Sequence, residues 1–329
     1  MDTAAETRPD SPLRGDAPLV VDRSERGKLA LSGDGAIEFL NGQVTNELVG
    51  LPVGNGRYAA FLNHKGGMLG DVRILHAVDP GAPELGPLLL LDTERSALQA
   101  LFDMIREFKV GFDVELHKRT LERAIVGLVG EHADALLDAV PGRDELDCTP
   151  AQVAGVPVLA IRTALGIDLY CEQAGGEPLI AALEAAGARA GEEQAAELAR
   201  IELGRPIFGV DIPVGTIPQE AGLNDRAVSF TKGCYVGQET VARLFYKGTP
   251  KRHLRGLRAS EPLTLGATVS LEGRELGTVT SAAVSPEIGP IALALLRKEA
   301  APGTTVELSP GARATVVELP FTGPEAPHR

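Results

Sequence analysis

The residues with the most chemical potential lie in one short glycine-containing segment, Lys232–Glu239 (KGCYVGQE). Gly233 and Gly237 flank its cysteine, Cys234, so the backbone can turn tightly there and approach a ligand closely. Residues 238–244 fit a helix, which places the thiol just ahead of a positive helix end and two residues after a lysine. Both features favour the thiolate, the reactive and metal-binding form of cysteine. The same spacing is also typical of a structural turn with an inert thiol, so spacing alone leaves both interpretations open.

Basic residues gather beside this segment. Between positions 232 and 258, seven Lys and Arg residues accompany one acidic residue, whereas the whole chain has 32 Lys and Arg against 45 Asp and Glu, a net charge of −13. A positive patch on an acidic protein concentrates small anions without holding a long polyanion. We therefore expect a carboxylate or phosphate ligand here and no nucleic acid, although a solvated basic linker explains part of the cluster equally well.

Two other segments carry polar residues in suggestive places. Asp71 and Arg73 are two residues apart on an expected strand, 67–78, and so share one face of it. Such a pair is either a surface ion pair or, beside a cleft, a holder for a polar ring edge. Residues 201–223, which include Glu220, read as a loop despite their apolar content. That run either lines an internal funnel or connects two domains.

The remaining motifs narrow the function and the compartment. No dinucleotide, P-loop, zincin or serine-hydrolase motif occurs, and the three cysteines have no metal-ligand spacing, so we expect no metal site and free thiols in a reducing compartment. No apolar run approaches the ~18 residues of a membrane span. The first 18 residues lack a secretory pattern and read as a flexible tail. A cytoplasmic protein without membrane contact is predicted.

The elements that position these residues suggest an α+β protein. We expect an extended segment over 19–31, strands over 58–62, 67–78, 87–92 and 111–116, and helices over 34–43 and from 92 or 93 to 108. A strand followed by Gly-x-x-Ala and an apolar-periodic helix recurs at Gly33 and Gly130, the second helix ending near Val140. Further strands are expected over 156–162 and 167–171 and helices over 178–186 and 192–203. The recurrence predicts a duplicated α+β unit.

The pattern changes after Pro250. Short alternating strands are expected over 268–271, 276–281, 291–295, 304–308 and 314–319, with a hairpin turn at Glu272-Gly273. Several short strands separated by Gly and Pro are typical of a small antiparallel barrel or sandwich. We therefore predict that the C-terminal part forms its own all-β unit.

Taken together, these segments resemble the folate-binding YgfZ family, which is related to the T-protein (aminomethyltransferase) of the glycine cleavage system. The matching runs are FLNGQVTN from Phe39, YAAFLNHKG from Tyr58 with Asp71, RIELGRPIFGVDI from Arg200, IPQEAGLN from Ile217 and, most specific, KGCYVGQE from Lys232.

The resemblance implies three subdomains around a central channel: two ferredoxin-like α+β units and a C-terminal antiparallel β-barrel. It implies a T-protein-like folate-binding module over residues 19–248, with units of about 19–120 and 121–248 whose strands can interleave. The barrel would cover 249–321, and residues 322–329 would form a second flexible tail.

The family's function then implies tetrahydrofolate, or a derivative, as ligand and iron–sulfur client or assembly proteins as partners, in cluster assembly or repair. Cys234 would be the functional side chain, with Lys232 as its activator. Asp71 and Glu220 would hold the pterin. The expected folate-contacting residues are Asp71, Arg73, Glu220, Lys232, Tyr235, Gln238, Glu239, Arg243, Lys247 and Arg252, of which Arg243, Lys247 and Arg252 suit the glutamate tail. The alternative function is a folate-dependent aminomethyl or one-carbon transferase.

Two departures from the T-protein bear on that choice. The enzyme carries two adjacent carboxylates after its Gly-Gly turn, whereas this chain has Gly70 followed by Asp71. On the strand that begins at Gly166, Cys171 occupies the place where the enzyme's pattern leads us to expect a pterin-binding glutamate. Both differences favour an assembly factor over the transferase.

Overall fold

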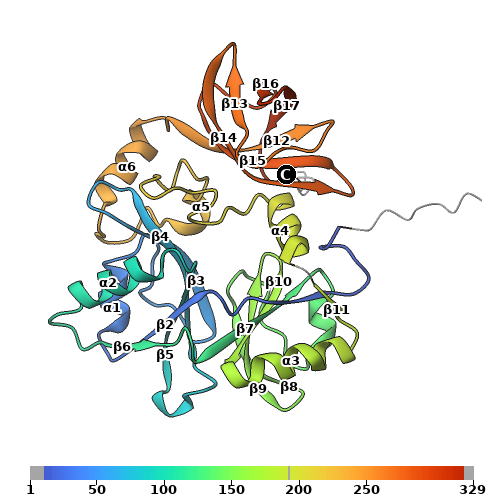
Figure 1. The fold of residues 1–329 in the computed structure, drawn as a ribbon. Coiled ribbons are helices and arrows are strands. Elements are labelled where there is room, and N and C mark those ends of the chain that lie inside the picture. Colours follow the sequence, from blue (N-terminus) through green and yellow to red (C-terminus); the bar gives the residue numbers. More distant parts are fainter. Residues whose placement is uncertain (1–10, 192, 322–329) are drawn as a thin grey trace, which may run out of the picture.

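Two β-sheets and a small barrel make up the protein in a computed structural model, which describes residues 11–191 and 193–321. Figure 1 shows the sheets side by side, with the barrel on the far side of a linker that carries α4, α5 and α6. The predicted tail over 322–329 and the first ten residues of the predicted tail over 1–18 lie outside the described residues. Residues 11–18 contact the folded body, where the buried Ser11 hydroxyl donates a 2.6 Å hydrogen bond to Glu202.

The first sheet has the order β3-β4-β5-β2-β6, and all its pairings are antiparallel. Its elements are β2 (Gly27–Ser32), α1 (Ala36–Asn41), β3 (Asn55–Leu62), β4 (Met68–Val78), β5 (Pro87–Thr93), α2 (Leu98–Phe108) and β6 (Glu115–Lys118), with a 3₁₀ turn, η1 (Pro83–Leu85), between β4 and β5. The strands expected from residues 58–92 are all present. Both helices pack on one face of this sheet and bury Phe39, Leu40, Leu101 and Ile105 there.

The second sheet has the order β11-β1-β7-β10-β9-β8. Its elements are β1 (Leu19–Asp22), β7 (Arg123–Val129), η2 (Ala133–Leu136), β8 (Cys148–Val153), β9 (Val156–Thr163), β10 (Gly166–Glu172), α3 (Gln173–Ala185) and β11 (Arg189–Ala190). The extended segment predicted over 19–31 is thus two strands in different sheets. Because β1 pairs with β7 of the second unit, the two units are intertwined.

The two units share a topology. In each, a strand is followed by a helical segment, three antiparallel strands, a helix and an edge strand, and the orders β3-β4-β5-β2 and β8-β9-β10-β7 correspond. The recurrence in the sequence therefore reflects a real structural repeat. The helix expected to end near Val140 is wrong, since only the short 3₁₀ turn η2 forms. Pro141 disfavours helical backbone at the residue before it, and Leu137 is already extended.

Alternation along the strands divides the side chains between two layers. Odd-numbered residues of β4 and even-numbered residues of β5 and β10 face the space between the sheets, where Leu75, Leu90 and Tyr170 form an apolar cluster. The opposite faces are covered by α1 and α2 on one sheet and by α3 on the other. The carboxylates of Asp71, Asp92 and Asp168 on these faces are therefore buried.

The C-terminal strands close into a six-stranded antiparallel barrel, as predicted. The strands are β12 (Arg252–Ala259), β13 (Thr268–Leu271), β14 (Arg274–Ser285), β15 (Gly289–Arg297), β16 (Thr305–Leu308) and β17 (Ala312–Val317), closed by pairing of β12 with both β15 and β17. Glu272 and Gly273 form the expected hairpin turn, both with positive φ.

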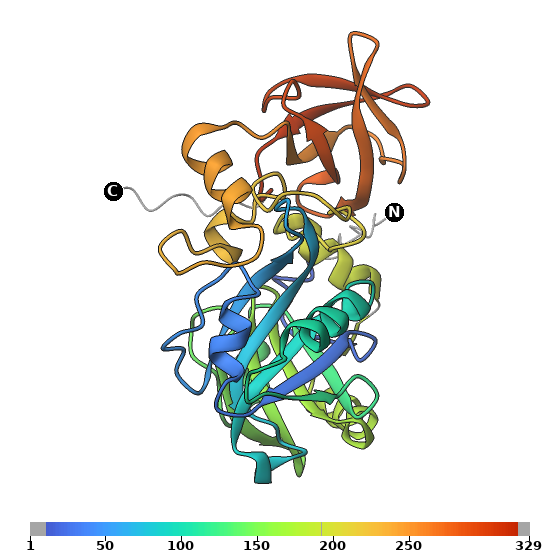
Figure 2. The same ribbon diagram turned by 90° about the vertical axis from the view of Figure 1, so that its left-hand side faces the viewer.

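The linker between the second sheet and the barrel contains α4 (Glu193–Glu202), α5 (Asn224–Ala227) and α6 (Gln238–Lys247). Figures 1 and 2 agree that α6 lies at the junction of the first sheet and the barrel. The helix predicted over 238–244 is confirmed, and α6 extends three residues further, to Lys247. This arrangement brings the KGCYVGQE segment against the first sheet.

Candidate functional site

Asp71 and Arg73 do share one face of β4, and that face is buried between the sheets rather than on the surface. Tyr58, on the neighbouring strand β3, pairs with Arg73 in register and points to the same side. Its hydroxyl donates a 2.5 Å hydrogen bond to Asp71 Oδ2. The guanidinium of Arg226, which lies on the short linker helix α5, is 4.7 Å from the centre of the Tyr58 ring. Four residues of three segments thus converge at the end of the intersheet space.

The Asp71 carboxyl has unusual electrostatics. Burial raises the pKa of Asp71 to about 6, although the hydrogen bond from Tyr58 acts in the opposite direction. Within the described part of the chain, no Lys or Arg lies within ion-pair distance of this carboxyl. A carboxyl with that pKa changes between its acid and base forms near neutral pH, which suits proton exchange with a bound ligand.

Arg73 belongs to a separate ionic network that joins the two sheets. It contacts Asp92 of β5 and, at 2.5 Å, Asp168 of β10, and Asp92 also accepts a 2.6 Å hydrogen bond from Arg26. Although burial acts to raise it, Arg23 and Arg73 bring the pKa of Asp168 down to about 2. Since two buried carboxylates already bind its guanidinium, Arg73 stabilises the interface between the two sheets.

The two departures from the T-protein pattern have structural reasons. Gly70 faces the helix-covered side of the sheet, where an added Cβ would lie 2.3 Å from the Phe61 ring, so a carboxylate cannot replace it without moving that ring. Cys171 is buried against α3, on the side of β10 opposite the intersheet space. The acidic side chain that β10 supplies to the intersheet space is Asp168.

Lys232 holds the KGCYVGQE segment in place. Its ammonium donates three hydrogen bonds of 2.6, 2.8 and 2.7 Å to the carbonyl oxygens of Asn41, Val44 and Asn46, at and beyond the end of α1. Burial lowers the pKa of Lys232 to about 8, so the group still carries three N–H donors at neutral pH to match three acceptors. Its Nζ also lies 5.3 Å from the centre of the Tyr235 ring. The three N–H groups of the Lys232 ammonium thus tie this segment to the first unit.

Cys234 is exposed, whereas Cys148 and Cys171 are buried and burial raises their pKa values to about 12 and about 11. Of the two glycines that flank Cys234, only Gly237 adopts a left-handed backbone conformation. Its φ is +80°, and a Cβ there would lie 2.6 Å from the Asn63 carbonyl oxygen. Gly233 has open space around it. The turn that carries the thiol therefore packs directly against the NHKGG loop before β4.

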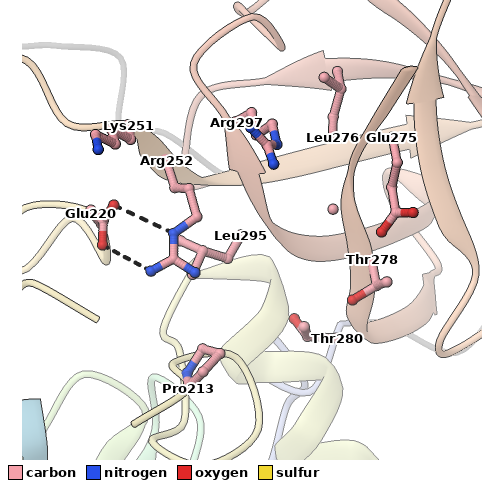
Figure 3. Close-up of a pocket in the computed structure, with 11 residues that line it drawn as sticks. Pro213, Glu220, Lys251, Arg252, Glu275, Leu276, Thr278, Thr280, Leu295 and Arg297 are labelled. Atoms are coloured by element: carbon pink, nitrogen blue, oxygen red, sulfur yellow. Dashed lines mark hydrogen bonds and ion pairs between the residues drawn. The ribbon is translucent and has the colours of Figure 1, made fainter. Parts of the chain in front are cut away.

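The other predicted ligand residues divide into two groups. Glu220 and Arg252 are brought together by an ion pair of 3.1 Å between the linker and the barrel (Figure 3). Tyr235 is buried, while Gln238, Glu239, Arg243 and Lys247 follow one another along α6, with the last three exposed. The tail-binding cations are thus on two elements, Arg252 on the barrel and the others on the helix.

Sequence reasoning missed Tyr58, Arg226, Asp92 and Asp168 as residues of the buried polar face. Only Asp168 left a usable signal, because it interrupts the apolar run Ile167–Cys171 on the face that alternation turns away from α3. The others are single polar residues, Tyr58 and Asp92 on strands and Arg226 on the short helix α5. Among the described residues, no group of three His, Cys, Asp or Glu side chains could hold a metal ion.

The comparisons with known proteins identify the architecture. The family model described as the GCVT N-terminal domain matches residues 15–232, and that of the glycine cleavage T-protein C-terminal barrel domain matches residues 252–322. The chain belongs to the glycine cleavage T-protein family. Its fold is accordingly the T-protein fold, with two α+β units, each built on one sheet, and a closed six-stranded antiparallel barrel.

Individual members of the T-protein family cover most of the chain. An aminomethyltransferase of Streptomyces avermitilis is 31% identical over 310 residues, which is 86% of this chain and 79% of that protein. A putative chloroplastic transferase of Arabidopsis thaliana is 27% identical over 321 residues, 94% of this chain and 72% of the relative. The solved aminomethyltransferase of Bartonella henselae superimposes with a TM-score of 0.80 at 25% identity, covering 94% of this chain and 87% of the other.

These matches support the broad T-protein relationship and leave the YgfZ branch as a prediction. Tetrahydrofolate dependence is consistent with the family. In the described residues, no helix is both long and apolar enough to cross a bilayer.

Proposed function

We propose that this protein binds a reduced folate at the polar end of the intersheet space and uses it in the assembly or repair of iron–sulfur clusters. The observation that carries the proposal is the hydrogen-bonded pair of the partly buried Tyr58 and the buried Asp71. It offers one carboxyl that is not neutralised by a cation, beside an aromatic ring and a guanidinium. A flat heterocycle with N–H groups at its edge needs such partners.

The chemistry of these residues fits a pterin. Asp71 would accept hydrogen bonds from ring N–H groups, and its pKa of about 6 lets it hold or return a proton near neutral pH. Tyr58 would keep the carboxyl in one orientation. When bound, tetrahydrofolate would supply nitrogen atoms able to carry a one-carbon unit, whether that unit is transferred or only held.

The role in cluster assembly rests on Cys234. It is the one exposed thiol of the three cysteines, and it lies on a turn fixed by Lys232 and by the close contact of Gly237 with the NHKGG loop. A single thiolate does not satisfy the usual four-cysteine ligation of a cluster, so a partner protein would provide the remaining ligands. The loss of the second carboxylate at Gly70 supports this reading over the transferase.

A second candidate function, a folate-dependent one-carbon transferase, is favoured by the relatives. The Streptomyces avermitilis and Bartonella henselae proteins are both aminomethyltransferases. In that case Asp71 would be the general base or acid of the transfer, and Cys234 would be dispensable.

Two measurements test these proposals. Calorimetric titration with tetrahydrofolate should give saturable binding that weakens at least about tenfold in Asp71→Ala and is unchanged in Asp103→Asn, an exposed control on α2. Absence of binding by the wild-type protein would sink the folate proposal.

Complementation of a cluster-enzyme defect separates the two functions. We expect the wild type to restore activity and Cys234→Ala to fail while still binding folate. Aminomethyl transfer that survives Cys234→Ala and disappears in Asp71→Ala would instead establish the transferase.

A further inference from the structure

A cavity lies between the barrel and the linker. Its volume is about 750 Å³, within the range of small-molecule sites, and its walls come from β12, β14, β15 and the linker around Pro213 and Glu220 (Figure 3). Tyr58 and Asp71, which carry the proposed pterin site, are not part of its lining, whereas Glu220, expected from the sequence to hold the pterin, is. It is therefore a separate feature of the molecule.

Three basic side chains line the cavity, and their mutual repulsion is unfavourable without an anionic ligand. Arg252 and Arg297 stand directly opposite each other on the antiparallel strands β12 and β15, and Lys251 is adjacent. Like charges in directly opposed positions repel each other. Glu220 pairs with Arg252 at 3.1 Å, but among residues 11–191 and 193–321 neither Arg297 nor Lys251 has a carboxylate within ion-pair distance.

The remaining walls offer both polar and apolar contacts. Leu276 and Leu295 contribute apolar surface, and Thr278 and Glu275 of β14 lie across the cavity from the arginines in Figure 3. The Thr280 hydroxyl is already used, since it donates a 2.6 Å hydrogen bond to Asp211. A ligand with negative charges at one end and an apolar body would match this division.

The backbone fixes the cationic wall before any ligand arrives. The N–H of Leu254 donates to the Glu220 carbonyl at 2.8 Å, and that of Lys298 donates to the Lys251 carbonyl at 3.0 Å. The linker and the two strands that carry the cations are thereby held together. The backbone would need little ordering on binding, so the ordering cost falls on the exposed side chains of Lys251 and Arg297.

We propose that this cavity binds a small molecule with two or more negative charges, through Lys251, Arg252 and Arg297. Such charges can come from a free organic polyanion or from the polyglutamyl tail of a folate. Only the second source rests on the proposed folate function, and it would place the tail at Arg252 rather than at Arg243 and Lys247 of α6.

The test uses the full chain, Arg297→Gln and, as a control, Arg313→Gln, an exposed arginine of β17 outside the cavity lining. Calorimetric titrations use free tri-γ-glutamate, pyrophosphate, and tetrahydrofolate with one or five glutamates. Because Arg297 is exposed, makes no ion pair in the described chain and stands opposite Arg252, the thermal unfolding midpoint of its variant should be no lower than that of the wild type.

Arg297→Gln should weaken binding about tenfold either for a free anion, which identifies the free source, or for the five-glutamate folate alone, which identifies the tail. Arg313→Gln should change neither. If Arg297→Gln weakens binding neither of a free anion nor of the five-glutamate folate, the proposal is overturned. Binding of the one-glutamate folate reports on the folate site alone and should be unaffected by Arg297→Gln.

Discussion

The Tyr58 hydroxyl donates its 2.5 Å hydrogen bond to Asp71 from the neighbouring strand, diagonally across one pair of the β3–β4 ladder. Because both side chains face the second sheet, the carboxyl is withdrawn from water by the fold itself and not by a mobile loop. The phenol is the one protein group that donates a hydrogen bond to this carboxyl in the described chain. The pair is thus largely buried, and within the described chain its carboxyl has no cation at ion-pair distance.

Asp71→Asn should stabilise the folded protein near neutral pH. The pKa of Asp71 is raised from 3.8 to about 6 in the folded state, so the folded protein binds this proton more tightly than the unfolded chain. The free energy of unfolding then falls as pH rises between about 4 and 6, by at most roughly 3 kcal/mol in total. Asparagine cannot ionise and still accepts the Tyr58 hydrogen bond.

Urea unfolding at pH 4 and pH 7 checks this effect. The variant should exceed the wild type by roughly 1 to 3 kcal/mol at pH 7 and match it near pH 4. Asp103→Asn, at an exposed position, should track the wild type at both. A variant less stable than wild type at pH 7 would show that the ionised carboxylate is favourably solvated.

Gly237→Ala should destabilise the protein, whereas Gly233→Ala should not. Alanine at 237 must adopt a φ of +80° and bring its Cβ 2.6 Å from a backbone oxygen, which together cost about 1 to 3 kcal/mol. Gly233 has open space and φ outside the left-handed region. The two variants add the same methyl group on either side of Cys234, so equal unfolding midpoints would refute the proposed contact with the NHKGG loop.

Much of the fold could be read from the sequence because alternation and helical periodicity follow burial. The strands β3, β4 and β5 and the strands of the barrel were predictable in this way. The sequence did not reveal which strands pair with each other. Residues 19–31 look like one extended segment, yet residues 23–26 form a turn, and β1 and β2 on either side of it join different sheets. Nothing in a local pattern specifies which sheet a strand joins.

The site was predictable in part for the same reason. The spacing of Asp71 and Arg73 gives their common face, but not that another sheet covers that face. The covering sheet supplies Asp168, so Arg73 joins a buried ionic network that does not include Asp71. Lys232 was expected to activate Cys234, and its position two residues away allowed that. Its long side chain instead reaches residues more than 180 positions earlier in the chain, a contact that only the tertiary structure defines.

Thiol labelling with an aromatic disulfide should distinguish the cysteines. In the native protein at pH 8 we expect one thiol to react within seconds to minutes and three to react in denaturant, because Cys148 and Cys171 are buried and their thiol pKa values are raised. Cys234→Ala should abolish the rapid native phase. Rapid labelling of a second thiol would mean that one of the sheet cores opens readily.

Lys232→Met should loosen the turn that carries Cys234. Methionine keeps most of the aliphatic stem but donates no hydrogen bond, so the carbonyls of Asn41, Val44 and Asn46 each lose their ammonium partner. Leaving buried acceptors unpaired costs about 1 to 3 kcal/mol each when water cannot reach them, and the actual loss depends on how far the turn relaxes. We expect the free energy of unfolding to fall by at least about 2 kcal/mol.

The structural readout for Lys232→Met is amide hydrogen exchange. Exchange should accelerate both around residues 230–237 and at the C-terminal end of α1, since the lysine connects these two segments. Lys247→Met removes a charge from an exposed position near the end of α6 and should leave both regions protected. If exchange rises only around residue 232, the three carbonyl contacts do not couple the segments, and the rigidity of the Cys234 turn must come from Gly237 alone.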